Sequence, residues 1–334
     1  MSDKDVIGFI GVGYMGHGMA HNIMKGGYPL VIKGNKNRVP VDDLVNSGAR
    51  EARDLADLVA QCEVIHMCLS NSPQVENIIF GAGGILENAK DGLIVIDCTT
   101  ADPTSTTRIA DAMAEKGMHF VDAPLGRTPK EAAEGTLDAM IGASDYLFER
   151  IKPIVECWSG NVIHVGPVGA GHKMKLIMNF IAMSYASLYS EATVLAAKSG
   201  LSPQKVNEVI GSSRLSNGFF ETFMKYLVGG DPNAHKFSLE NGAKDIGYVA
   251  NMAHDAQMMN PMGAAAKNYF THAIATGNGG NYVPTLVDMI GAINGINIQD
   301  EVEKGRCCPF IPRALVQRQL PKRPPSASKA PLKC

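Results

Sequence analysis

Two stretches of the chain carry residue types and spacings that suit chemistry. The first is a glycine-rich run near the start, Gly11-Val12-Gly13-Tyr14-Met15-Gly16. In a G-x-G-x-x-G pattern the first glycine permits a tight turn, the second lets the backbone approach a pyrophosphate, and the third allows close helix packing. The second stretch, Gly169-Ala170-Gly171, leads into Lys175 and Asn179. A lysine amine at that place could give a proton to whatever a dinucleotide reduces.

The residues around the glycine run supply the local structure that a dinucleotide site requires. Residues 6–10 are a short apolar run typical of a buried strand, and residues 19–25 have a helical pattern that ends at Gly26-Gly27. Strand, glycine turn and helix follow one another, so the helix N-terminus would face the anion. The sequence therefore predicts that residues 11–16 bind a dinucleotide rather than form a purely structural turn.

The stretch after the next predicted strand, residues 30–32, bears on the choice between the two nicotinamide dinucleotides. An NAD site usually offers an Asp or Glu about 20 residues after the glycine pattern to bind the ribose. Here residues 33–41, between this strand and Asp42, contain no acidic residue. Because Asn35, Lys36 and Arg38 suit a 2′-phosphate that a carboxylate would repel, we expect NADP to be favoured over NAD. The alternative is a basic loop that only faces solvent.

Repeated β/α units fill the first half of the chain. We expect a helix at residues 43–60, buried strands at residues 64–69, 93–97 and 120–124, and a closing helix and strand at residues 146–157 and 162–165. Near-continuous apolar strands between helices predict a parallel sheet with both faces covered. His66 lies inside a predicted strand and is interpreted as a core residue rather than a catalytic one.

The pattern changes to helices in the second half. Residues 173–198 predict one unbroken helix of about 40 Å at 1.5 Å per residue. Residues 176–197 are apolar enough to suggest a membrane-spanning helix as an alternative. Asn179, Glu191 and the lack of basic flanks instead favour a helix buried between domains or subunits. Further helices are expected at residues 202–212, 218–228, 244–256, 262–276 and 284–294. Such extensive apolar helix surface usually contacts a partner subunit, so we expect a homodimer or homotetramer.

These patterns together define an α/β fold. We expect a Rossmann-type doubly wound parallel sheet over residues 1–167, followed by an all-helical second domain over residues 168–303. Residues 304–334 are rich in proline and basic residues without periodicity, and they predict a disordered tail. That tail is interpreted as a dispensable or abnormal extension, with binding to an acidic partner as the alternative.

Composition narrows the partners and the setting. Residues 306–334 hold seven Lys/Arg and no acidic residue, so residues 1–305 carry 24 basic and 33 acidic side chains, a net of −9. This acidic body argues against nucleic-acid binding. No cysteine spacing resembles a zinc site, so no metal is expected, and Cys62, Cys68, Cys98 and Cys157 suit reduced core thiols. Without a basic n-region or an expected membrane span, the predicted location is the cytoplasm.

Lys175 is the candidate proton donor. It lies near the start of the long predicted helix, at the junction of the two domains, and an apolar run follows it. Partial burial would lower its pKa toward the working pH, as general acid–base catalysis requires. Asn179 shares the same helical face and could orient Lys175 or the substrate. From the residues alone, a lysine that extends into solvent from a helix end is equally compatible.

Four motifs, taken in order, resemble the β-hydroxyacid dehydrogenases, the 3-hydroxyisobutyrate dehydrogenase family. They are the glycine run, flanked by Phe9-Ile10 and Met19-Ala20; Asp122-Ala123-Pro124 with Gly135-Thr136-Leu137; Gly169-x-Gly171-x-x-x-Lys175-x-x-x-Asn179; and Lys244-Asp245. The resemblance spans residues 6 to about 300. It implies a Rossmann domain plus a helical domain, assembled as dimers or tetramers.

The resemblance also implies roles for individual residues. Lys175 would be the catalytic acid/base, and Asn179 would assist at the substrate. Lys244 would lie near the nicotinamide and the substrate. The residues implied to line the cofactor are Leu69, Ser70 and Thr100.

Two departures from the family pattern bear on the substrate. The usual Ser-Gly-Gly after Asp-x-Pro-x is Gly126-Arg127-Thr128 here, and the usual Asn before Asn179 is Met178. Gly126 removes a hydroxyl that would contact a substrate carboxylate, while Arg127 adds a forked cation suited to a larger oxyanion. A Gly-Arg-Thr loop is similar to that of the sulfolactaldehyde reductases of this family, although Met178 departs from their pattern too. Alternatively, Arg127 pairs with Glu131 or Glu134 on the surface.

We therefore expect an NAD(P)-dependent oxidoreductase that interconverts a small anionic aldehyde, a semialdehyde or a sulfolactaldehyde-like compound, and its 3-hydroxy acid. Lys175 would handle the proton, and Gly126, Arg127, Thr128 and Asn179 would bind the substrate. Alternatives within the class are tartronate-semialdehyde, succinic-semialdehyde or 3-hydroxyisobutyrate substrates, and a decarboxylating relative of 6-phosphogluconate dehydrogenase. Outside the class, the alternative is a non-catalytic dinucleotide-binding sensor, against which Lys175 and Asn179 argue.

Overall fold

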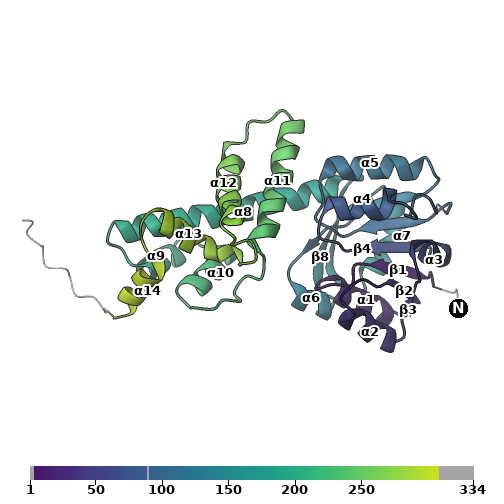
Figure 1. Cartoon of the computed structure of the whole chain (residues 1–334), viewed down its shortest axis with the longest axis horizontal. Helices are drawn as coiled ribbons and strands as arrows, with labels where there is room; N and C mark the ends of the chain where they lie inside the picture. The colour runs from purple at the N-terminus through teal and green to yellow at the C-terminus, as the bar shows by residue number, and fades with distance from the viewer. Residues whose placement is uncertain (1–3, 89, 308–334) are drawn as a thin grey trace, which may run out of the picture.

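The chain folds into two domains joined by one long helix, α8 (Ala170–Lys198) (Figure 1). In the computed structural model of the chain, residues 4–88 and 90–307 are described. Most of the predicted tail at residues 304–334 therefore lies outside the described residues. Helix α14 continues to Cys307, past the predicted end of the helical domain at residue 303.

The first domain is built on one sheet with the strand order β3-β2-β1-β4-β5-β6-β8-β7, and β9 pairs with β8. The neighbours from β3 to β6 are parallel, whereas β8 runs antiparallel to β6 and β7. The strand order reverses beside β1, where ligands bind in doubly wound sheets. The strands are β1 (Ile7–Ile10), β2 (Leu30–Lys33), β3 (Arg50–Glu51), β4 (Val64–Met67), β5 (Ile94–Asp97), β6 (His119–Asp122), β7 (Leu125–Gly126), β8 (Leu137–Gly142) and β9 (Ser159–Gly166).

Helices cover both faces of this sheet, with α1, α2 and α6 on one side and α4 and α5 on the other (Figure 1). One buried core includes Phe9, Met19 and Trp158, and a second includes Ile65 and Val95 on the opposite face. The prediction of a parallel sheet buried on both faces is confirmed. The helices are α1 (Gly16–Lys25), α2 (Val39–Asn46), α3 (Leu55–Gln61), α4 (Ser72–Phe80), α5 (Pro103–Ala114), α6 (Pro129–Glu134) and α7 (Asp145–Val155).

The single helix predicted at residues 43–60 is wrong. The structure has α2, the short strand β3 and α3 in that region. Gly48 adopts φ 110°, a left-handed conformation that ends the first helix. Asp54 then starts α3, because its carboxylate accepts a hydrogen bond of 2.8 Å from Asp57 N. Both residues are turn and cap signals that the helical pattern obscured.

The second domain is helical, as predicted, and packs around its own core, which includes Leu176, Phe220, Phe223 and Phe270. Its helix α11 begins five residues earlier than expected because Ser238 caps it, accepting from Asn241 N at 3.2 Å. No described helix is long and apolar enough to cross a membrane. The helices are α8, α9 (Pro203–Gly211), α10 (Gly218–Leu227), α11 (Leu239–Asp255), α12 (Pro261–Ala275), α13 (Leu286–Ile293) and α14 (Ile298–Cys307), with a 3-10 turn (Val283–Thr285) before α13.

His66 is a core residue, as predicted. Its side chain is fully buried in β4, where the ring stacks on Phe9 at a centroid distance of 5.7 Å and meets Trp158 edge-on. Burial lowers the pKa of His66 to about 3, so the ring is neutral at physiological pH.

Candidate active site

The glycine run forms an open cradle between β1 and α1. Gly11 has φ 95°, and a Cβ there would lie 2.2 Å from the carbonyl oxygen of Cys68. A Cβ on Gly16 would lie 2.0 Å from Gly11 O, whereas one on Gly13 would meet nothing within 4 Å. The N-cap residue of α1, Met15, makes no side-chain cap bond, so no capping side chain covers the backbone N–H groups at the start of the helix. These residues fit the pyrophosphate of a dinucleotide.

Two carboxylates hold Arg38 at the end of β2. Its Nη1 and Nη2 donate to Glu51 at 2.7 and 2.8 Å, and Nη2 also donates to Asp42 at 2.9 Å. These hydrogen bonds hold the pKa of Glu51 below its usual range. Asn35 and Lys36 are exposed beside this group. Sequence reasoning missed Glu51 because it comes from β3, which pairs with β2 through Ile32.

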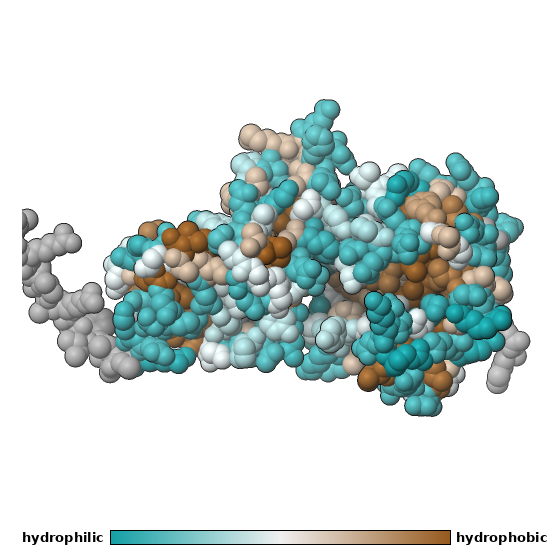
Figure 2. Space-filling model, in the orientation of Figure 1, coloured by the Kyte–Doolittle hydropathy of each residue, from teal (hydrophilic) through white to brown (hydrophobic). Residues whose placement is uncertain are grey.

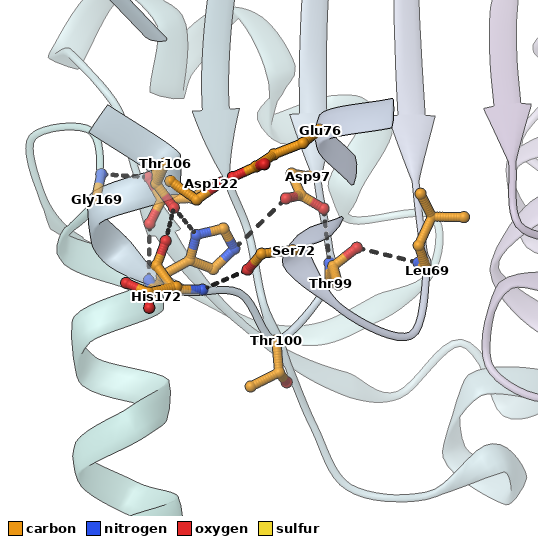
Figure 3. A network of polar contacts seen from close by, with 12 residues as sticks. Leu69, Ser72, Glu76, Asp97, Thr99, Thr100, Thr106, Asp122, Gly169 and His172 are labelled. Carbon is orange, nitrogen blue, oxygen red and sulfur yellow. Dashed lines mark hydrogen bonds and ion pairs between the residues drawn. The ribbon is translucent and has the colours of Figure 1, made fainter. Parts of the chain in front are cut away.

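Leu69, Ser70 and Thr100 lie in the loops that follow β4 and β5, the two strands that come after β1 on the side away from β2. Figure 3 shows Leu69 and Thr100 in these loops. Leu69 N donates to Thr99 Oγ1 at 3.0 Å, which ties the two loops together. Helix α11 reaches these loops from the second domain, because Lys244 Nζ donates to Thr100 O at 3.0 Å. The structure therefore brings these four residues together at the C-terminal ends of β4 and β5.

A buried carboxylate organises the site between α8 and α11. Asp245, only 1% exposed, accepts a hydrogen bond of 2.6 Å from Asn179 Nδ2 and forms an ion pair of 2.9 Å with Lys244 Nζ. Among the described residues, the Asn179 amide therefore bonds to Asp245 and not to Lys175, and its expected role at the substrate stays a prediction. Sequence reasoning recorded Asp245 only as part of a motif and gave it no role.

Lys175 projects from α8 close to this group and is half-buried. Burial lowers the pKa of Lys175 below its usual value, an effect that the nearby Asp245 carboxylate opposes and Lys244 reinforces. Across residues 4–88 and 90–307, the Lys175 amine has no hydrogen bond or ion pair with another side chain or carbonyl. An unpaired amine with a lowered pKa, facing a domain junction, suits proton transfer.

The loop after β7 holds Arg127 in a left-handed conformation, with φ 77°. Its Nε donates to Asp138 Oδ2 at 3.0 Å, so the partner is Asp138 on β8 and neither Glu131 nor Glu134. The charge of Asp138 also weakly opposes the lowering of the Lys175 pKa that burial causes. Gly126 lies against the same side chain, since a Cβ added at Gly126 would lie 3.1 Å from Asp138 Cβ.

Thr128 has a structural role in this loop. Its hydroxyl bonds to Glu131 Oε2 at 2.5 Å and accepts from Lys130 N at 3.3 Å, which caps α6. These bonds occupy the Thr128 hydroxyl, and its expected role at the substrate stays a prediction. Of the three loop residues, Arg127 offers the free donors, because only its Nε is bound to Asp138.

His235 is a residue of this region that sequence reasoning missed. Its ring packs edge-on against Phe219 and Phe237, at centroid distances of 5.4 and 6.2 Å. Burial lowers the pKa of His235, and the charge of Lys175 lowers it further. A histidine in a loop between helices carries no local signal that could have indicated this position.

Comparisons with known proteins agree with this two-domain arrangement. The NAD binding domain of 6-phosphogluconate dehydrogenase matches residues 6–166, and the NAD-binding domain of NADP-dependent 3-hydroxyisobutyrate dehydrogenase matches residues 169–290. The 2-(hydroxymethyl)glutarate dehydrogenase of Eubacterium barkeri is 32% identical over 293 residues, covering 87% of this chain and 97% of that protein. The 3-sulfolactaldehyde reductase of Escherichia coli is 31% identical over 273 residues, covering 82% of this chain and 91% of that protein. A crystal structure of 3-hydroxyisobutyrate dehydrogenase from Salmonella typhimurium matches with a TM-score of 0.74 at 25% identity, covering 85% of this chain and 99% of that one.

The matched domains, a Rossmann domain with an open glycine cradle and a helical domain joined to it by α8, define an NAD(P)-dependent oxidoreductase acting on CH–OH groups. The chain belongs to the 3-hydroxyisobutyrate dehydrogenase family of NAD(P)-dependent hydroxyacid dehydrogenases.

Proposed function

We propose that this protein reduces a small anionic aldehyde to its 3-hydroxy acid with NADPH, and catalyses the reverse reaction with NADP⁺. The observation that carries the proposal is the unpaired, half-buried amine of Lys175, which lies beside the Asn179–Asp245–Lys244 group at the C-terminal edge of the sheet. A nicotinamide dinucleotide in the glycine cradle would supply the hydride in the reducing direction.

The residues of the chain divide the remaining work. The Lys175 ammonium donates a proton from Nζ to the carbonyl oxygen as that oxygen becomes a hydroxyl, and the neutral amine takes a proton in the reverse direction. Asp245 holds Asn179 and Lys244 in place from a site that water does not reach. Lys244 in turn holds the Thr100 loop against α11. The proton donor is therefore left free while its neighbours are fixed.

The anion of the substrate is assigned to Arg127. Nε bound to Asp138 fixes the guanidinium plane and leaves the two Nη groups to bind an oxyanion in forked geometry. The first substrate we propose is a three-carbon aldehyde that carries a sulfonate group, in line with the name of the Escherichia coli relative. The test is a panel of sulfolactaldehyde, tartronate semialdehyde and succinic semialdehyde, each with NADPH and with NADH. Tight NADPH binding without turnover of any of them would instead support a non-catalytic sensor.

Replacing Arg127 by alanine is expected to raise KM for the preferred aldehyde by about tenfold or more, because a hydrogen bond to a charged group contributes about 1.5–3 kcal/mol. Arg127→Lys is expected to recover only part of this loss, since an ammonium cannot form the fork. Steady-state kinetics measure both. Arg53→Ala, which removes an exposed arginine paired with Asp57, is the control. An unchanged KM in Arg127→Ala would remove Arg127 from the anion site.

The preference for NADPH is assigned to Asn35, Lys36 and Arg38. Glu51 weakens this preference, because its carboxylate binds the Arg38 guanidinium. Arg38→Ala is expected to weaken NADPH binding by about tenfold and NADH binding far less, since only NADPH offers a 2′-phosphate. Glu51→Gln frees the guanidinium and is expected to tighten NADPH binding about two- to fivefold, as for a surface ion pair. Fluorescence titration measures both, with Arg50→Ala on the same strand as control. Equal affinities for the two cofactors in the wild-type protein would contradict the assignment.

We also propose that α8 forms the contact between subunits of a dimer or tetramer. A stripe of half-exposed apolar residues runs along this helix at spacings of three, four and seven residues, and hydrophobic surface reaches solvent on the helical domain (Figure 2). The stripe consists of Met174, Met178, Ile181, Tyr185, Leu188 and Leu195. Such a stripe is typical of helix-to-helix association.

The double change of Ile181 and Leu188 to lysine is expected to convert the oligomer into a species of the monomer mass, 35.6 kDa, in light scattering. Val209→Lys on α9, at a side chain 58% exposed, is the control and should leave the mass unchanged. A wild-type protein that is monomeric at micromolar concentration would contradict the proposal.

A further inference from the structure

Three ionisable side chains lie buried together at the start of α8, outside the proton-transfer group (Figure 3). Asp97 ends β5, Asp122 ends β6, and His172 lies in the first turn of α8; they are 1%, 0% and 0% exposed. Buried charges are costly unless they are paired or hydrogen-bonded. The steps proposed above use none of the three.

Asp122 fixes the backbone of the helix start. Its Oδ1 accepts from Gly169 N at 2.6 Å and its Oδ2 from His172 N at 2.7 Å, so a strand end caps α8 where no residue of the helix does. Gly171 presses against the same edge, because a Cβ there would lie 2.3 Å from Met140 O. These contacts leave the helix little freedom to slide along its axis.

The ring of His172 fixes the helix from a second side. Nδ1 lies 2.7 Å from Thr106 Oγ1 on α5. The Thr106 hydroxyl donates its hydrogen to Asp102 O at 3.1 Å, so it accepts from a protonated Nδ1. Nε2 faces Asp97 Oδ2 at 4.0 Å and has no hydrogen bond to any of the described residues. The Thr106 bond is therefore the strong contact of the ring.

Asp97 continues this network to the loops that border the cradle. Its Oδ1 accepts from Thr99 N at 2.9 Å, and Thr99 Oγ1 accepts from Leu69 N at 3.0 Å. Figure 3 shows these contacts running from the strand ends to His172. The network thus connects the start of α8 to the Leu69 loop without passing through Lys175.

Lys175 depends on this anchor more than its neighbours do. Asn179 and Lys244 are held by Asp245, but the described structure gives the Lys175 amine no partner. Its location is therefore set by where α8 places the backbone one turn after His172. A displacement of about 1 Å in a reacting group can cost about 10²-fold in rate.

We propose that His172 is a positioning residue: by bonding to Thr106, it holds the first turn of α8 against the strand ends and so sets the place of the Lys175 amine. This inference rests on the proton-transfer role proposed for Lys175. It goes beyond that role because it assigns a task to a side chain that touches neither substrate nor cofactor.

The test compares His172→Ala, His172→Asn and His172→Gln. Asparagine places an amide N–H near the position of Nδ1 and keeps the donor to Thr106, whereas glutamine reaches only the Nε2 position. We expect kcat to fall about tenfold to 10²-fold in the alanine and glutamine variants and to be largely retained in the asparagine variant. NADPH affinity should stay within about twofold in all three, because the cradle is untouched. If alanine and glutamine variants do not fold, Thr106→Val removes the same bond from the other side.

A second readout does not depend on turnover. After reductive ¹³C-methylation of the cofactor-free protein, NMR follows the titration of the Lys175 amine, which we expect to shift in His172→Ala and not in His172→Asn. His66→Leu removes an equally buried histidine that lies in β4 and should leave both readouts unchanged. A folded His172→Ala with wild-type kcat and wild-type titration would overturn the inference, and so would an equal loss in the asparagine variant. Failure of the proposed function is distinguishable, because Lys175→Met would then keep its activity.

Discussion

Replacing Lys175 by methionine is expected to lower kcat by about 10²–10⁴-fold, the usual contribution of a positioned general acid. Methionine keeps a chain of similar reach and removes only the amine, so the cofactor should still bind with near wild-type affinity. Rapid-mixing measurement of NADPH oxidation with the preferred aldehyde gives the rate, and fluorescence titration gives the affinity. Lys173→Met, an exposed lysine two positions earlier on the same helix, is the matched control.

The pH dependence of the reaction supplies an independent check. Reduction needs the protonated amine, so kcat for reduction should be full below the pKa of Lys175 and fall as the pH rises through it. Because burial lowers the pKa of Lys175, this fall should come below the usual lysine range. Oxidation of the hydroxy acid needs the neutral amine and should show the opposite limb. A Lys175→Met variant that keeps near-normal kcat, or a reduction rate without this limb, would refute the proton role.

Asp245→Asn is expected to lower kcat/KM by about tenfold to 10²-fold, because the change removes the charge that holds Lys244 and Asn179, and a charged hydrogen bond contributes about 1.5–3 kcal/mol. The variant should also change the pH profile. Asp245 opposes the lowering of the Lys175 pKa, so its neutralisation should lower that pKa further and move the fall in reduction rate to lower pH. Steady-state kinetics across pH measure both effects.

The control for this variant is Asp255→Asn at the other end of the same helix. Asp255 is exposed and accepts a single hydrogen bond of 2.7 Å from Thr104, so its neutralisation should leave the Lys175 limb in place. A pH limb that stays at its wild-type position in Asp245→Asn would show that the carboxylate does not act on the lysine. Thermal unfolding of both variants separates this effect from loss of the fold.

Local patterns predicted the parts of the site that depend on short stretches of chain. The spacing of Gly11, Gly13 and Gly16 predicts the cradle, because a Cβ at Gly11 or Gly16 would collide with a backbone carbonyl, while Gly13 borders open space. Apolar runs alone predict the buried strands β1, β2, β4, β5 and β6, whereas the buried strand β8 was missed. The break between α2 and α3 was missed because Gly48 and Asp54 lie in a stretch whose overall pattern still looks helical.

The sequence by itself determined the fold class, the glycine cradle, the long helix and the placement of Lys175 and Asn179 on one face of it. Tertiary structure alone decided which side chains the site residues bond to. Asn179 bonds to Asp245, 66 residues away; Arg127 to Asp138, 11 residues away; and Arg38 to Glu51, 13 residues away. The physical reason is that backbone sterics and hydrophobic periodicity act within a few residues, whereas a hydrogen bond between side chains forms wherever packing brings two elements together. Within residues 4–88 and 90–307, that packing leaves the lysine amine without a partner, which no pattern of its neighbours along the chain could have predicted.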